Sequence, residues 1–181
     1  MKKYVFILAA ATMGMLVSCN TKNEGGMSDA AKKNKDANDA ILKMFETGDY
    51  SKAGDYIAKD AVDHAGPKGD LVGLDSTKAY FNQMTTMMTN VKNEVVKTPA
   101  DDEYVMAWVK GTATAKNDIP EWGMKAGQSH TGNSVEVARF KDGKAVEHWS
   151  FTDAAEMMQM MQQAAPPMKD MGTMKDTAAK K

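Results

Sequence analysis

Apolar residues in the first half of the chain recur every three or four positions, the spacing that places them on one face of an α-helix. The clearest run predicts an amphipathic helix and consists of Ala37, Ile41, Met44 and Phe45. Gly48 is expected to end this helix, because glycine is common just past a helix C-terminus. A short helix over residues 50–59 and an extended segment over 61–64 follow. A third helix is predicted to start after an N-cap at Asp75 or Ser76.

After Asn90 the pattern changes to an alternation of apolar and polar residues, which is typical of half-buried β-strands. Four strands are predicted, over residues 91–98, 103–115, 128–141 and 144–152. Asp142-Gly143 predicts a tight hairpin between the last two strands. The stretch 116–127 is expected to be a long, irregular loop. Helices grouped ahead of an antiparallel sheet indicate the α+β class.

A last helix is predicted from Asp153 to about Gln163. Asp153 is placed to be its N-cap, and Glu156 lies three residues later, where it can complete a capping box. A cavity role for Asp153 is the alternative. Pro166-Pro167 should stop the helix, and the polar, Met-containing segment 166–181 is predicted to be a disordered tail.

The N-terminus has the order of a secretory signal: Lys2 and Lys3, then an apolar run over residues 4–17 that is too short to cross a membrane as a helix. Leu16-Val17-Ser18-Cys19 resembles the lipobox of bacterial lipoproteins. We therefore expect removal of residues 1–18, a lipid on Cys19 that anchors the chain to a membrane, and a location in the bacterial cell envelope, on the periplasmic side or the cell surface. An ordinary signal peptide that ends near a cysteine is the alternative.

Removal of residues 1–18 leaves 163 residues, which suits one domain with a core of its own. The polar segment 19–35 is predicted to be a flexible tether whose last part merges into a helix, and 36–165 is predicted to be the folded domain. The remaining 21 basic and 24 acidic residues give a formal charge of −3, which argues against a nucleic-acid partner. Cys19 is the only cysteine, so no internal disulfide can form.

Three segments of this sequence resemble one protein family. Ile41-Leu42-Lys43-Met44-Phe45-Glu46-Thr47-Gly48-Asp49-Tyr50 is similar to its opening helix, and Asp60-Ala61-Val62-Asp63-His64 to its first short strand. Arg139-Phe140-Lys141-Asp142-Gly143-Lys144-Ala145-Val146-Glu147-His148-Trp149, followed by Asp153 and a Gln-rich helix, is similar to its last hairpin and closing helix. The family is the SnoaL-like, polyketide cyclase-like branch of the nuclear transport factor 2-like superfamily.

This resemblance, over residues 36–165, implies a cone-shaped fold. A curved antiparallel sheet would wrap around the N-terminal helices, enclose a cavity and end in a C-terminal helix. It also implies a homodimer through the outer face of the sheet. Members include cyclases, isomerases, dehydratases, epoxide hydrolases and domains without known chemistry, so the fold alone does not identify the function.

Strand alternation predicts which side chains line the cavity. Val146, His148 and Ser150 should share one face of the last strand, although a β-bulge would reverse this assignment. The family match places the acid/base aspartate of the cyclases at Ser150 and a family histidine at Glu136. A serine hydroxyl has no useful pKa near neutrality, so cyclase chemistry is not expected by that route. The candidate cavity residues are His64, Trp108, Ser134, Glu136, His148 and Ser150.

His148 and Glu136 are the candidate catalytic pair. His148 could be a general base that Glu136 orients, since a carboxylate bonded to an imidazole fixes its tautomer and raises its pKa. It could equally be a cavity-wall histidine that only forms hydrogen bonds. His64, with Asp63, is a second candidate at the cavity mouth, or a strand-end residue. Trp108 could stack on a ligand or belong to the core.

No metal or cofactor is expected, because His64, His130 and His148 lack the spacing of metal ligands. A copper site at Met168, Met171 and Met174 is the alternative, since thioethers suit Cu(I), although Met is also a common core residue. The sequence favours a module that binds a small apolar molecule or a partner protein, without catalysis. The alternative is a lyase, isomerase or hydrolase that uses the His148/Glu136 pair.

Overall fold

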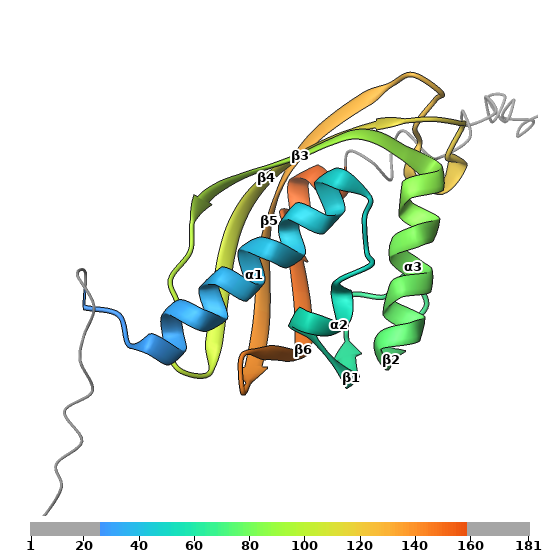
Figure 1. Ribbon diagram of the computed structural model, residues 1–181. Helices are drawn as coiled ribbons and strands as arrows, with labels where there is room; N and C mark the ends of the chain where they lie inside the picture. The colour runs from blue at the N-terminus through green and yellow to red at the C-terminus, as the bar shows by residue number, and fades with distance from the viewer. Residues whose placement is uncertain (1–25, 159–181) are drawn as a thin grey trace, which may run out of the picture.

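Helix α1 (Asp29–Thr47) lies diagonally across one face of the sheet (Figure 1). The computed structural model describes residues 26–158. Ser28 caps the helix by accepting a hydrogen bond from the Ala31 amide, and Gly48 ends it in the left-handed conformation with φ 69°. The last part of segment 19–35 thus belongs to this helix, as expected, and the folded domain begins before residue 36. Ala31 and Asn34 in that stretch are buried, and the Asn34 amide donates to the carbonyls of Asp101 and Asp102.

The segment 50–59 is not the single helix that the sequence predicts. Helix α2 (Ala53–Tyr56) is a single turn, and β1 (Ile57–Asp63) begins directly after it. Ile57 and Ala61 are buried in one apolar cluster with Met44 and Phe81. Pairing with the last strand thus overrides the local helical spacing, as tertiary contacts often do.

Helix α3 (Leu74–Met87) follows the two-residue strand β2 (Leu71–Val72). Its N-cap is Gly73, with φ 86°, and neither Asp75 nor Ser76 as predicted. Ser76 lies inside the first turn, where its hydroxyl donates to the carbonyl of Gly73. Glycine can adopt this positive φ without strain, and so the helix begins earlier than the side-chain capping pattern indicates.

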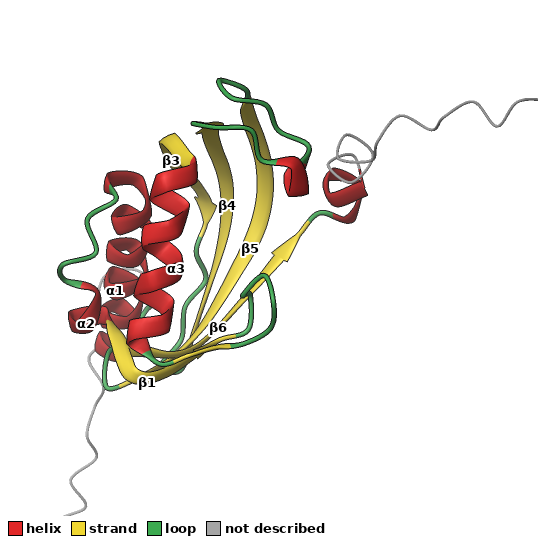
Figure 2. Cartoon of the chain, turned by 90° about the vertical axis from the view of Figure 1, so that its right-hand side faces the viewer, coloured by secondary structure: helices red, strands yellow, loops and turns green. Residues whose placement is uncertain are grey.

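The four predicted strands are present with small shifts at their ends. They are β3 (Met88–Lys97), β4 (Tyr104–Ala115), β5 (Ser129–Lys141) and β6 (Lys144–Thr152). The sheet order is β2-β1-β6-β5-β4-β3, and every pair is antiparallel except the parallel β1–β6 pair. Figure 2 shows the helices on one face of this curved sheet, which gives the expected α+β architecture.

The predicted irregular loop over 116–127 contains one short helix, η1 (Pro120–Trp122). Ile119 and Met124 flank it and are buried against Met88 and Ala115. The loop therefore closes the end of the sheet with an apolar cluster of its own.

The hairpin between β5 and β6 turns at Asp142 and Gly143, whose φ angles are 55° and 80°. Positive φ at both positions is the requirement of the predicted tight turn. A register shift follows: Arg139 pairs with Glu147, but Phe140 pairs with Ala145, so one residue of β6 is extra. Because of this irregularity Ala145, and not Val146 as predicted, is buried on the inner face.

The C-terminal helix starts as predicted after Asp153, whose carboxylate accepts from the amides of Ala155 and Glu156. The capping box is wrong, because Glu156 instead binds the backbone and side-chain nitrogens of Asn133. Residues 154–158 are helical. The predicted continuation to Gln163, the tail 166–181 and the lipobox with Cys19 lie outside the described residues. No helix within 26–158 is long and apolar enough to span a membrane.

Candidate functional site

A cavity of about 300 Å³ lies between α1, α3 and the inner face of the sheet. Its walls are mainly apolar, with Ile41 and Phe45 from α1, Phe81 from α3 and Val109 from β4. The volume is at the lower end of the roughly 300–1,000 Å³ typical of ligand sites. It therefore fits a molecule of modest size.

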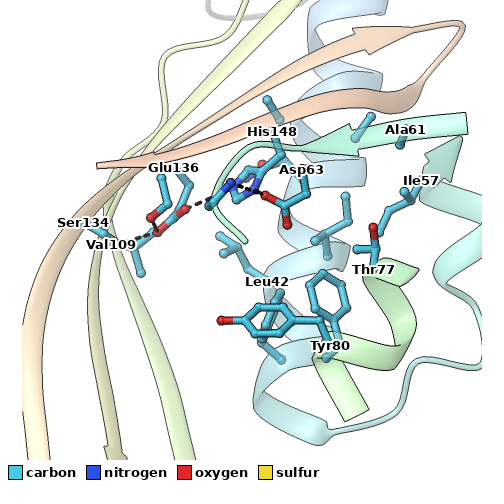
Figure 3. A pocket seen from close by; sticks show the side chains of 18 of the residues that line it. Leu42, Ile57, Ala61, Asp63, Thr77, Tyr80, Val109, Ser134, Glu136 and His148 are labelled. Atoms are coloured by element: carbon cyan, nitrogen blue, oxygen red, sulfur yellow. Dashed lines mark hydrogen bonds and ion pairs between the residues drawn. The ribbon is translucent and has the colours of Figure 1, made fainter. Parts of the chain in front are cut away.

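One wall of this cavity carries a hydrogen-bonded group of three ionisable side chains (Figure 3). Nδ1 of His148 lies 2.9 Å from Oδ1 of Asp63, and Nε2 lies 3.1 Å from Oε2 of Glu136. His148 comes from β6, Glu136 from β5 and Asp63 from the end of β1. Both ring nitrogens of the imidazole thus face a carboxylate.

The second oxygen of Glu136 is also fully occupied. Oε1 accepts hydrogen bonds from the hydroxyls of Ser134, at 2.5 Å, and Ser150, at 3.1 Å. Four of the six predicted cavity residues, Ser134, Glu136, His148 and Ser150, therefore lie together in the cavity wall. The alternation along β5 and the pairing of Glu136 with Ser150 bring them there.

The electrostatics of this group favour a charged imidazole. Burial disfavours the imidazolium, but the hydrogen bonds and charges of Asp63 and Glu136 outweigh it and raise the pKa of His148 to about 9. Burial works against ionisation of both carboxylates too, yet their bonds to His148 keep the pKa of Asp63 and that of Glu136 below the ordinary values. At neutral pH the group holds one positive and two negative charges.

Asp63 is hydrogen-bonded to a different histidine from the one that the sequence predicts. We expected it beside His64, its neighbour in the chain. Asp63 and His148 are instead paired across the parallel β1–β6 contact, which no local pattern reveals. The one available signal was the place of Asp63 two residues after the apolar Ala61, on the same face of the strand, since a buried charge needs a partner.

The two remaining predicted residues lie elsewhere. His64 does not line the cavity: its Nδ1 lies 3.1 Å from Asp70, and its ring stacks on Trp149 at 4.9 Å. The prediction that Trp108 lines the cavity is wrong, since it lies on the opposite face of β4 with 48% of its surface exposed. Lys110, two residues further on, shares that outer face and was the signal for this orientation.

Two polar atoms at the cavity keep unused hydrogen-bonding capacity. Asn38 of α1 is 5% exposed and lines the cavity, and its Nδ2 has no hydrogen-bond partner within residues 26–158. Asp63 is 7% exposed. Its Oδ1 accepts from His148 and from the Ala65 amide, whereas Oδ2 accepts no hydrogen bond from the described part of the chain (Figure 3). Burial, and then the nearby charge of Asp63, raise the pKa of the Tyr80 phenol.

Metal binding finds no support in the described part of the chain. Within residues 26–158 no three His, Cys, Asp or Glu side chains form a group that could hold a metal ion. Met168, Met171 and Met174, the alternative copper ligands, lie outside these residues.

Comparison with known proteins agrees with this architecture. The sequence profile of the SnoaL-like polyketide cyclases matches residues 35–162. No curated protein sequence matches the chain significantly.

Solved structures with the same fold include a putative polyketide cyclase of Xanthomonas campestris pv. campestris, which is 12% identical, with a TM-score of 0.65 over 75% of this chain and 99% of that one. IdmH of Streptomyces antibioticus, also a putative polyketide cyclase, is 20% identical, with a TM-score of 0.58 over 71% and 98%. An LEH-like epoxide hydrolase of M. tuberculosis is 13% identical, with a TM-score of 0.60 over 74% and 92%. At these identities the likeness concerns the fold alone.

Proposed function

The chain belongs to the SnoaL-like polyketide cyclase family, and from that premise we propose that it is an envelope lipoprotein whose cavity binds a small apolar molecule without converting it. The observation that carries this proposal is that His148 and Glu136 have no unused hydrogen-bonding atom. Nδ1 of His148 is bonded to Asp63 and Nε2 to Glu136, and the second oxygen of Glu136 accepts from the hydroxyls of Ser134 and Ser150. Neither member of the candidate catalytic pair, His148 or Glu136, is therefore free to take a proton from a substrate.

Two further observations support binding over catalysis. An imidazole with a pKa of about 9 is protonated at neutral pH, so His148 cannot accept a proton there. At the position that the family resemblance assigns to the acid/base aspartate, the chain has Ser150, whose hydroxyl donates to Glu136. The apolar walls, in contrast, suit burial of hydrocarbon surface at about 25 cal/mol per Å².

The test measures binding and turnover on the same protein with uncharged probes. Full-length chain in detergent would be titrated with cyclohexanone, cyclohexene oxide and caprolactone by calorimetry, against detergent alone, and each mixture analysed for products. We expect binding without product. Product formation that disappears in His148→Gln or Glu136→Gln, with the fold intact, would favour the alternative lyase, isomerase or hydrolase.

Gly111 offers a way to block the cavity with a matched control. It lines the cavity, and a β-carbon there would approach only Oδ1 of Asn93, at 3.8 Å, an ordinary contact. Gly111→Val should therefore occupy part of the cavity and weaken binding. Thr112→Val, on the neighbouring residue of β4 that does not line the cavity, should leave binding unchanged.

The membrane anchor is a separate part of the proposal. The lipobox-like sequence before Cys19 supports a diacylated cysteine, and several buried CH₂ groups at roughly 0.8 kcal/mol each hold such a chain on a membrane. Cys19→Ala should move the protein from the membrane fraction to a soluble periplasmic or secreted pool. Intact-mass analysis of the wild type should show the lipid and the loss of residues 1–18, and an unmodified thiol there would contradict the anchor.

We also propose that two copies associate through the outer face of the sheet. Met106 and Trp108 of β4, Val135 of β5 and Phe151 of β6 are exposed there. Trp108, Val135 and Phe151 are direct neighbours across the three strands. Contiguous apolar patches of this kind mark interaction surfaces.

A further inference from the structure

The charge of the cavity wall restricts what the cavity can hold. Asp63 and Glu136 share a single imidazole, so the group they form with His148 carries at least one net negative charge whether the imidazole is protonated or not. Glu147 also borders the cavity, but it is paired with Arg139 at 2.7 Å. No lysine or arginine lines the cavity within the described residues. An anion placed there would meet repulsion without any compensating cation.

Oδ2 of Asp63 is the atom of this negatively charged group that a ligand can bind. Asp63 is 7% exposed, and its Oδ2 accepts no hydrogen bond from residues 26–158. Oδ2 retains accessible surface at the cavity that Asp63 lines, so a ligand can reach it, and a donor there forms a hydrogen bond with the carboxylate. A donor carried by the ligand would satisfy it, and a positively charged donor forms the stronger bond.

The walls opposite are suited to the same kind of group. Phe45, Tyr80 and Phe81 line the cavity, and aromatic faces attract ammonium ions. Asn38 independently indicates a polar ligand, since its 5%-exposed amide has a nitrogen without a partner in the described chain.

We propose that the cavity takes a small apolar molecule that bears a protonated amine, with Asp63 as its counter-ion, and that it rejects carboxylates and other anions. The proposal rests on the proposed binding function and narrows it to a class of ligand. The amine is held by Oδ2 of Asp63, and the hydrocarbon part fills the space between α1, α3 and the sheet.

Three probes with one carbon skeleton test the charge preference: cyclohexylmethylamine, cyclohexylmethanol and cyclohexanecarboxylate. Each would be titrated at pH 7 into full-length chain in detergent, against detergent alone. We expect the amine to bind roughly tenfold more tightly than the alcohol, the difference between a charged and a neutral hydrogen bond. The carboxylate should bind more weakly than the alcohol.

Asp63→Asn should remove the preference, so that the ratio of the amine affinity to the alcohol affinity falls from roughly ten to about one. Asp60→Asn is the matched control, since Asp60 is an exposed carboxylate on the same strand that does not line the cavity. It should keep the preference. Glu136→Gln also removes one charge from the cavity wall and should reduce the preference. It is the substitute test if Asp63→Asn does not fold.

The two proposals fail in different ways. If the alcohol binds but the amine is no tighter, or the carboxylate is as tight, the amine proposal is overturned and the binding function stands. A preference that persists in folded Asp63→Asn overturns the role of Asp63. If none of the three probes binds, and cyclohexanone and cyclohexene oxide do not bind either, the binding function fails and the amine proposal fails with it.

Discussion

His148 owes its charge to two carboxylates from different strands, and its stability effect should depend on pH. Its pKa is raised from 6.5 in a free imidazole to about 9 in the folded protein. The stabilisation is therefore complete below about pH 6.5, declines as the pH rises towards 9, and is lost above that value. The stabilisation is also lost in acid, where Asp63 and Glu136 become protonated, because their pKa values are lowered in the folded protein.

We expect the free energy of unfolding of the wild type to fall by about 2 kcal/mol relative to His148→Gln between pH 6.5 and 9.5. This figure is smaller than the full shift implies, because 32% of the His148 side chain is exposed and solvent screens it. Urea denaturation at both pH values measures it, and NMR should find the imidazole still protonated at pH 7.5. An imidazole that titrates at 6.5 or below would contradict the arrangement.

Asn38 and Asn34 provide a matched pair on α1. Both are buried, but Asn34 donates to the carbonyls of Asp101 and Asp102, whereas Nδ2 of Asn38 has no partner within residues 26–158. Asn38→Leu should raise the stability of the ligand-free protein by about 1 kcal/mol, and Asn34→Leu should lower it by a similar amount. Urea denaturation separates the two. A loss of stability in Asn38→Leu would show that its amide is already satisfied.

At the scale of elements, the start of α1 determines where the folded domain begins. Residues 29–35 carry the buried Ala31 and the bonds of Asn34, and Ser28 caps the helix. A chain that begins at residue 36, the boundary expected from the sequence, should be less stable than one that begins at residue 26 by roughly 2–4 kcal/mol, the sum of one cap, one or two hydrogen bonds and one buried methyl group.

Denaturant unfolding of the two chains, both ending at residue 181, tests this boundary. Ser28→Ala in the longer chain should account for about 1 kcal/mol of the difference, the typical value of an N-cap. Equal stability of the two chains would mean that the first two turns of α1 contribute nothing to the fold.

At the scale of the whole molecule, the proposed association predicts a change in mass rather than in folding. Trp108→Ser combined with Phe151→Ser should convert a dimer into a monomer, measured by light scattering at several concentrations. Both side chains are about half exposed in the single chain, so their loss should not unfold it. Val72→Ser, at a more exposed apolar position on the far strand β2, should leave the dimer intact. A wild-type protein that is monomeric at every concentration would contradict the interface.

Much of the fold could be predicted from the sequence because the signals are local. Alternation fixes which residues of β5 and β6 share a face, so Glu136 and Ser150 were placed together correctly. Positive φ at Asp142 and Gly143 follows from a two-residue turn, and the cap at Asp153 from its own carboxylate. Each of these features depends on residues that are at most a few positions, or one hairpin, apart.

The parallel contact between β1 and β6 was decided only by the tertiary structure. It joins Asp63 to His148 across 85 residues of sequence, and with it come the charge of the imidazole and the unused carboxylate oxygen. The packing of the sheet on the helices likewise turned Ile57 into a strand residue and left Trp108 outside. The spacing of apolar residues indicates which face of a segment is buried. The strand with which that segment pairs depends on the burial free energy of the whole domain. That is why the sequence determined the elements and half of the site, while the folded chain supplied the charged partner that defines it.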